Sequence, residues 1–103
     1  ALQASEAVDA IAPTENSKYF IGVTSYSAAA DIMTEVGELV KSKKKDDQAM
    51  ACTESKQAED LFAKTSLAMP AGGKVDPGTA GQILGAVSQY AAYIPQVKKA
   101  FCK

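Results

Sequence analysis

Hydrophobic side chains recur along most of the chain at alternating intervals of three and four residues, which places them on one face of an α-helix. This spacing predicts four helices, at about residues 5–12, 16–44, 47–69 and 76–101. No segment shows sustained alternation with a period of two, so no strand is predicted. The pattern therefore predicts an all-α protein with one short helix followed by three long ones.

Each predicted helix has an apolar face that we expect to be buried. In the first two helices these faces are formed by Ala4, Val8 and Ile11, and by Tyr19, Val23, Tyr26, Ala30, Met33, Gly37 and Val40. The second face is widened by Phe20, Ile32, Val36 and Leu39. In the last two they are formed by Ala51, Ser55, Ala58, Phe62, Thr65 and Met69, and by Ala80, Ile83, Val87, Tyr90, Ile94, Val97 and Phe101. Short connections make consecutive helices antiparallel neighbours. We expect a single domain, residues 1–103, folded as an up-down-up-down four-helix bundle with a short first helix.

The helix ends have recognisable signals. Thr14 or Asn16 can cap the second helix, because a side-chain oxygen there accepts a hydrogen bond from a free backbone amide. Pro70 is expected to stop the third helix, since proline has no amide hydrogen to continue it. Asp76-Pro77 provides an N-cap followed by proline at the first helical position. Pro95, inside the fourth helix, is expected to kink it.

The composition excludes several classes of protein. The 103 residues include 12 acidic and 11 basic side chains, no His and no Trp, and every basic residue is Lys. A net charge of -1 argues against a nucleic-acid module, and no apolar run is long enough to span a bilayer. Without His the chain lacks the commonest general base and metal ligand. We therefore expect no enzyme, no catalytic site, no metal and no cofactor.

Two cysteines, Cys52 and Cys102, fall near the start of the third helix and at the end of the fourth. Antiparallel packing brings these two ends to the same pole of the bundle, so we predict a disulfide between them. The alternative is two free thiols packed as small hydrophobic side chains. A structural disulfide indicates an exported or otherwise oxidising compartment.

Lysines form the most distinctive surface feature, and we predict that they bind a partner. Between the second and third helices they are Lys41, Lys43, Lys44 and Lys45, and at the end of the fourth they are Lys98, Lys99 and Lys103. All seven are expected at the pole that holds the cysteines. Such a group can dock on an acidic partner or an anionic surface. The alternative is that the lysines, with Asp46 and Asp47, only complement the helix dipoles.

The remaining polar residues suggest no chemistry. Two acidic groups are interpreted as solvated helix faces: Asp31, Glu35 and Glu38, and Glu54, Glu59 and Asp60. The run Gly72-Gly73-Lys74 lacks the remaining residues of a phosphate-binding loop and is interpreted as a flexible loop.

The C-terminal run from Gly78 to Tyr90, with its continuation to Phe101, resembles a known family. The small size, the lack of His, the lysine-based charge and the start without Met are also similar to this family. It comprises the extrinsic lumenal four-helix-bundle subunits of photosystem II, the PsbQ-like proteins and the related diatom subunit. No diagnostic motif carries the resemblance, so no functional residue is transferred from it.

The resemblance implies a non-catalytic subunit, peripheral to the membrane, in the thylakoid lumen. Its partners would be intrinsic and other extrinsic subunits of photosystem II, bound through lysines that face acidic lumenal loops. It would shield the manganese-calcium cluster of oxygen evolution and help to retain calcium and chloride. When isolated it would be a monomer.

Two other functions remain open from the sequence. One is a secreted carrier of a small apolar ligand, with Tyr90, Tyr93 and Phe101 lining a cleft at Pro95. The other is a secreted effector that binds a host protein.

Overall fold

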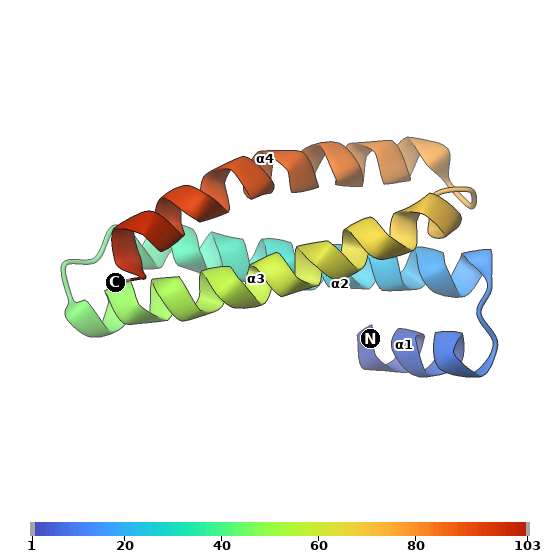
Figure 1. Ribbon diagram of the computed structural model, residues 1–103, viewed down its shortest axis with the longest axis horizontal. Coiled ribbons are helices and arrows are strands. Elements are labelled where there is room, and N and C mark those ends of the chain that lie inside the picture. Colours follow the sequence, from blue (N-terminus) through green and yellow to red (C-terminus); the bar gives the residue numbers. More distant parts are fainter. Residues whose placement is uncertain (1, 103) are drawn as a thin grey trace.

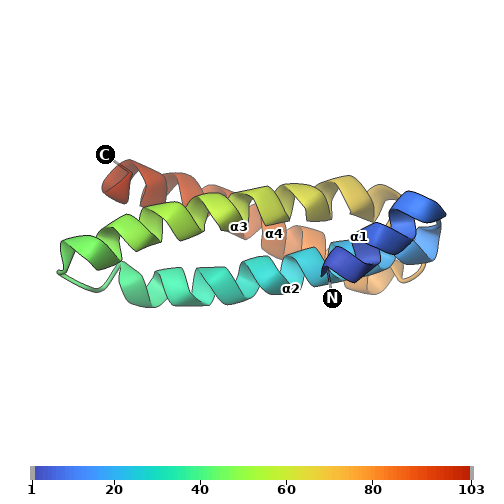
Figure 2. The ribbon, with the colours of Figure 1, turned by 90° about the horizontal axis from the view of Figure 1, so that it is seen from below.

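The computed structural model describes residues 2–102, which form four α-helices and no strand. They are α1 (Leu2–Ile11), α2 (Glu15–Leu39), α3 (Lys45–Gly72) and α4 (Pro77–Phe101). The three long helices run antiparallel to their neighbours in sequence, and α1 lies beside the start of α2 and the end of α3 (Figure 1 and Figure 2). The predicted all-α bundle with a short first helix is confirmed. The molecule is elongated, with extents of 46 × 25 × 18 Å.

Small side chains form the contact between α2 and α3. The residues of α2 that are buried are Ser17, Ile21, Gly22, Ser25, Ala29, Met33 and Val36. Met33 and Val36 are buried as predicted, whereas the rest of the predicted face is wrong by about one position, because it followed the larger apolar residues. Those residues, such as Val23 and Tyr26, are only partly buried and pack beside the contact. Glycine, serine and alanine lie at its centre because they allow two helix backbones to approach closely.

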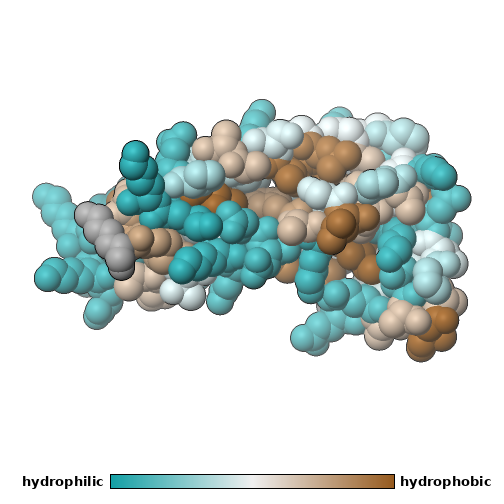
Figure 3. All heavy atoms as spheres, viewed as in Figure 1, coloured by the Kyte–Doolittle hydropathy of each residue, from teal (hydrophilic) through white to brown (hydrophobic). Residues whose placement is uncertain are grey.

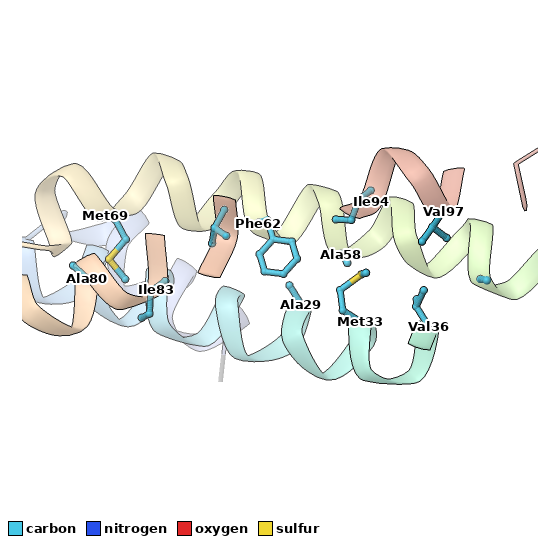
Figure 4. Close-up of a cluster of buried hydrophobic side chains, with 12 residues drawn as sticks. Ala29, Met33, Val36, Ala58, Phe62, Met69, Ala80, Ile83, Ile94 and Val97 are labelled. Atoms are coloured by element: carbon cyan, nitrogen blue, oxygen red, sulfur yellow. The ribbon is translucent and has the colours of Figure 1, made fainter. Parts of the chain in front are cut away.

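The faces predicted for the third and fourth helices are confirmed. All six predicted residues of α3 are buried, as are five of the seven predicted on α4, and the other two are partly buried against the core. Phe62 points from α3 toward Ala29 of α2 in the middle of the cluster (Figure 4). The rings of Phe62 and Tyr90 are stacked with their centres 4.9 Å apart, which joins α4 to the same core.

Two predicted helix ends are wrong. The second helix ends at Leu39 rather than Lys44, so the lysines that follow form the α2–α3 turn. The third continues through Pro70 to Gly72. Pro70 is exposed and lies in the last turn, where the missing amide hydrogen costs only one hydrogen bond at the end of the helix. The predicted N-caps at Thr14 and Asp76 are confirmed.

The face predicted for the first helix is also wrong, since Val8 and Ile11 point outward and are 58% and 86% exposed. The buried residue of α1, among those described, is Asp9. Its carboxylate accepts hydrogen bonds from Ser17 Oγ and Lys18 Nζ, each at 2.6 Å. A polar contact, rather than an apolar one, therefore attaches α1 to the bundle.

The predicted disulfide is confirmed. Cys52 in the second turn of α3 is bonded to Cys102, the residue that caps α4, with 50 residues of sequence separation. The extension of α3 to Gly72 reduces the difference in length between the two helices, and α4 curves over α3 (Figure 1). The bond fixes the end of α4 to the pole of the bundle near the α2–α3 turn.

Candidate functional site

Four lysines project from the α2–α3 turn at one end of the molecule. We call Lys41, Lys43, Lys44 and Lys45 the lysine turn; all four are exposed. Ser42 orders this turn, because its hydroxyl donates to Asp47 Oδ2 at 2.6 Å and accepts from the Lys44 amide at 3.2 Å. The lysine side chains are thus presented by a fixed backbone.

The charges of the lysine turn are mostly unpaired. Lys41 Nζ lies 3.7 Å from Glu38 Oε1 on the surface, a contact that contributes little in water. Within residues 2–102, Lys43, Lys44 and Lys45 take part in no ion pair. The segment 38–47 holds four lysines and three acidic residues, and its excess of one positive charge contrasts with a chain whose net charge is -1.

The lysines of α4 lie apart from this turn. Lys98 Nζ is bound to Glu59 Oε1 at 3.1 Å, and Glu59 lies about 20 Å along α3 from Lys45 at 1.5 Å per residue. Lys99 is exposed. Lys103 lies outside the described residues. Lys98 is therefore partly neutralised and at a distance from the lysine turn.

The other end of the molecule carries apolar side chains that sequence reasoning missed. Val8, Ile11, Phe20 and Leu67 are exposed there on α1, α2 and α3. A hollow of about 280 Å³ between α1 and α2 is lined by Ala4, Ser5, Val8, Ser17 and Phe20. Figure 3 shows hydrophobic residues over α1 and the neighbouring helices, whereas the end with the lysine turn is mostly hydrophilic. The sequence could have predicted this surface only if Asp9 had been recognised as the buried residue of α1, because Val8 and Ile11 would then have been placed on the exposed side.

A shallow apolar groove lies between α3 and α4. It has a volume of about 190 Å³ and is lined by Glu59, Phe62, Ala63, Ser66, Val87, Ala91 and Ile94. The residues predicted to line a cleft, Tyr90, Tyr93 and Phe101, instead pack partly buried against the core. The groove is therefore formed by other residues than those predicted.

Glu54 departs from the solvated face predicted for it. Its Oε2 atom is buried and has no hydrogen-bond donor. Burial raises the pKa of this carboxyl, and the neighbouring carboxyl of Glu35 on α2 raises it further. The two carboxyl groups therefore lie near each other across the α2–α3 contact. The sequence of one helix alone could not predict this pair, because it depends on how α2 and α3 are aligned.

Neither a metal centre nor a membrane span is found in the described part of the chain. Residues 2–102 contain no group of three or more side chains suited to a metal ion. None of the helices over the same residues is long and apolar enough to cross a bilayer. No protein-family model, curated protein or solved structure matches the chain.

Proposed function

We propose that the chain is a non-catalytic docking protein that binds an acidic surface through its lysine turn. Three lysines in sequence, exposed and without ion pairs on a turn ordered by Ser42, carry this proposal. Unpaired surface cations attract an acidic partner over about a Debye length, ~8–10 Å at physiological salt. The lysines of α4 contribute less, because Lys98 is bound to Glu59.

The partner in this proposal is photosystem II, as the resemblance of the chain to its extrinsic subunits implies. The protein would bind intrinsic and other extrinsic subunits on the lumenal side and stabilise the manganese-calcium cluster and its ions. An all-α bundle with a disulfide supports the proposal, since such a bond is typical of oxidising compartments. The thylakoid lumen is the proposed location, with secretion as the alternative.

The test compares two variants that each lose two charges. Lys43→Gln/Lys45→Gln removes charges from the lysine turn, whereas Lys56→Gln/Lys74→Gln removes two exposed lysines elsewhere. Binding to photosystem II membranes stripped of extrinsic subunits is measured at low and high salt. We expect the first variant to bind about 3- to 10-fold more weakly and the second to bind as the native protein does. Circular dichroism checks that the helix content is unchanged.

The outcomes test separately whether the lysine turn is the docking surface and whether photosystem II is the partner. Equal weakening by both variants, or binding that is insensitive to salt, would exclude docking by the lysine turn. Absence of binding by the native protein would exclude photosystem II as the partner.

The α3–α4 groove supports a second candidate, a carrier of a small apolar ligand. Its lining is formed largely by apolar side chains, including Phe62, Val87 and Ile94. Native mass spectrometry of the protein from its source tests this function. A co-purified lipid or pigment would favour the carrier, and a protein of unmodified mass that releases from thylakoid membranes with salt would favour the docking subunit.

A further inference from the structure

The register of α2 against α3 places Glu35 beside Glu54. Ser25 Oγ and Thr65 Oγ1 lie 2.8 Å apart, which fixes the register in the middle of the contact. Ten residues further along α2 from Ser25 is Glu35, and ten residues back along α3 from Thr65 is Ser55, directly after Glu54. The bond from Ser42 to Asp47 near the turn agrees with this register. The pairing thus sets the two glutamates at the same level of the hairpin, where the carboxyl of Glu35 acts on that of Glu54.

The two carboxyl groups have no cation to balance them. Within the described residues neither Glu35 nor Glu54 forms an ion pair, and the buried Glu54 Oε2 accepts no hydrogen bond from any other group. Two carboxylates cannot hydrogen-bond to one another unless one of them carries a proton. A single shared proton would allow one carboxyl group to donate a hydrogen bond to the other.

The charged groups near this pair on α2 and α3 supply no positive charge that would balance the two carboxylates. On α2 the charged neighbours one turn from Glu35 are Asp31 and Glu38, and Glu38 lies 3.7 Å from Lys41 on the surface. On α3 the neighbours one turn from Glu54 are all uncharged: Met50, Ala51, Gln57 and Ala58.

The cations of α4 face another side of α3. Cys52 and Glu59 mark the side that contacts α4, through the disulfide and the ion pair to Lys98. Cys52 and Glu54 are about 200° apart around the helix axis at 100° per residue. Lys98 is therefore occupied elsewhere, Lys99 is exposed, and α1 lies at the other end of the bundle.

We propose that Glu35 and Glu54 share a proton and form a pH-sensitive lock on the half of the α2–α3 hairpin that ends in the lysine turn. When one carboxyl is protonated, it donates to the other and holds the helices together. When both are ionised, two negative charges repel each other across the contact. The disulfide joins α3 to α4 at this end, whereas α2 is joined to α3 there only by the turn itself, so the end of α2 and the lysine turn are the parts that loosen.

The direction of the pH dependence follows from the raised pKa of Glu54. The folded protein holds this proton more tightly than the unfolded chain does, so the contribution to stability is present at low pH. It is lost as the pH rises from the ordinary glutamate pKa, 4.5, through the higher value of the folded state. Asp9 and Asp76, whose pKa values are lowered in the fold, titrate below this interval. The lock holds in mild acid and opens toward neutral pH, whether or not the lysine turn is the docking surface.

Two measurements on the disulfide-bonded protein test the lock. Thermal unfolding between about pH 4.5 and 7.5 compares the native protein with Glu54→Gln and with Glu38→Gln, an exposed neighbour that serves as the control. We expect the melting temperature of the native protein and of the control to fall over this interval. Glu54→Gln should lose most of that fall and melt higher than the native protein at pH 7.5.

Carbon-13 NMR of the carboxyl groups supplies a readout that does not depend on a variant folding well. In the native protein the midpoint of Glu54 should lie above the ordinary glutamate value of 4.5, and Glu35→Gln should move it toward that value. Amide exchange in the lysine turn, corrected for its intrinsic pH dependence, should be faster at pH 7.5 than at pH 5. If Glu54 titrates at the ordinary glutamate value, or Glu54→Gln keeps the full fall in melting temperature, the lock does not exist.

Discussion

Ser25 Oγ of α2 and Thr65 Oγ1 of α3 lie 2.8 Å apart in a hydrogen bond whose two residues are completely buried. Ser25 Oγ also lies 2.6 Å from the carbonyl of Ile21, and Thr65 Oγ1 lies 3.2 Å from that of Leu61. Ser25 Oγ lies 3.2 Å from the carbonyl of Gly22 as well, so the two hydroxyl groups have only two hydrogens for four contacts. The shorter distances indicate that Ser25 donates to Ile21 and Thr65 donates to Ser25.

Thr65→Val should destabilise the protein by about 0.5–1.5 kcal/mol, because it deletes this donor while keeping the shape of the side chain. Ser55→Ala is the matched contrast: it removes a buried hydroxyl that has no hydrogen-bond partner, so it should be neutral or stabilising. Urea unfolding of the two variants measures the difference. Equal losses in both would show that the hydrogen bond between α2 and α3 contributes nothing specific.

Gly72→Ala should destabilise the protein by about 1–3 kcal/mol. A Cβ atom at this position would lie 2.5 Å from the Tyr19 amide nitrogen and 2.6 Å from its Cα, so one backbone must move away from the other. Gly85→Ala is the control, since a Cβ there meets nothing within 4 Å on an exposed part of α4. The control should gain about 0.5–1 kcal/mol from its higher helix propensity. Thermal or urea unfolding measures both the expected loss of stability in Gly72→Ala and the expected gain in Gly85→Ala. An unchanged stability of Gly72→Ala would contradict the close approach of α3 to α2.

Asp9→Asn should release α1 while the three long helices stay folded. The asparagine cannot form the ion pair with Lys18, and α1 buries no apolar side chain. The remaining ion pair of α1, from Glu6 to Lys64 of α3 at 3.2 Å, lies on the surface and contributes little. Faster amide exchange in residues 2–11, with unchanged exchange in α3, is the expected result. Val8→Ser is the control, because this exposed side chain does not attach the helix. Unchanged protection of α1 in Asp9→Asn would contradict the role of the ion pair.

The attachment of α1 should also depend on pH in a direction set by Asp9. The hydrogen bonds from Lys18 and Ser17 lower the pKa of the Asp9 carboxyl below its ordinary value of 3.8. The stabilising contribution is therefore complete above this value and is lost as the pH falls through the lower value of the folded state. Amide exchange of α1, followed downward from pH 5, should accelerate only in strong acid. Release of α1 at pH 5 would exclude Asp9 as the group that holds it.

Reduction of the Cys52–Cys102 disulfide should destabilise the protein by about 2–4 kcal/mol, because the bond restricts a loop of 50 residues in the unfolded chain. The last turns of α4 should lose amide protection first, while α2 and α3 keep theirs. Thermal unfolding with and without reductant measures the loss, and Cys52→Ser/Cys102→Ser serves as a variant in which reductant should have no effect. An unchanged melting temperature on reduction would contradict this contribution.

The long helices could be predicted from the sequence because each buries one continuous face. On α3 and α4 the three-and-four spacing identified the core residues, and the positions of Cys52 and Cys102 were sufficient to predict their bond. The contact on α2 could not be predicted in this way. It is built from Gly22, Ser25 and Ala29. These residues lie at the contact because they are small and let α3 approach closely, and not because they are hydrophobic.

The orientation of α1 and the carboxyl pair escaped prediction for a related reason. Asp9 is buried only because Ser17 and Lys18 of the next helix satisfy its charge, and a pattern of hydrophobic residues cannot express that. Glu54 looks like a surface residue on its own helix, and only the register with α2 brings Glu35 beside it. Both depend on pairs of residues in different helices.

The Cys52–Cys102 bond also changes what a cut in the backbone would do. The residues between α3 and α4 include Lys74, which is exposed and gives trypsin a cleavage site in the connection between the two helices. Because the bond spans this connection, the two pieces produced by a single cut there would remain one covalent molecule until reduced. Cleavage at Lys43 or Lys44, outside the bridged interval, would instead separate α1 and α2 from the rest of the chain with no covalent link. A single cut between Cys52 and Cys102 therefore leaves the pieces covalently joined, whereas after a cut before Cys52 only noncovalent packing holds them together.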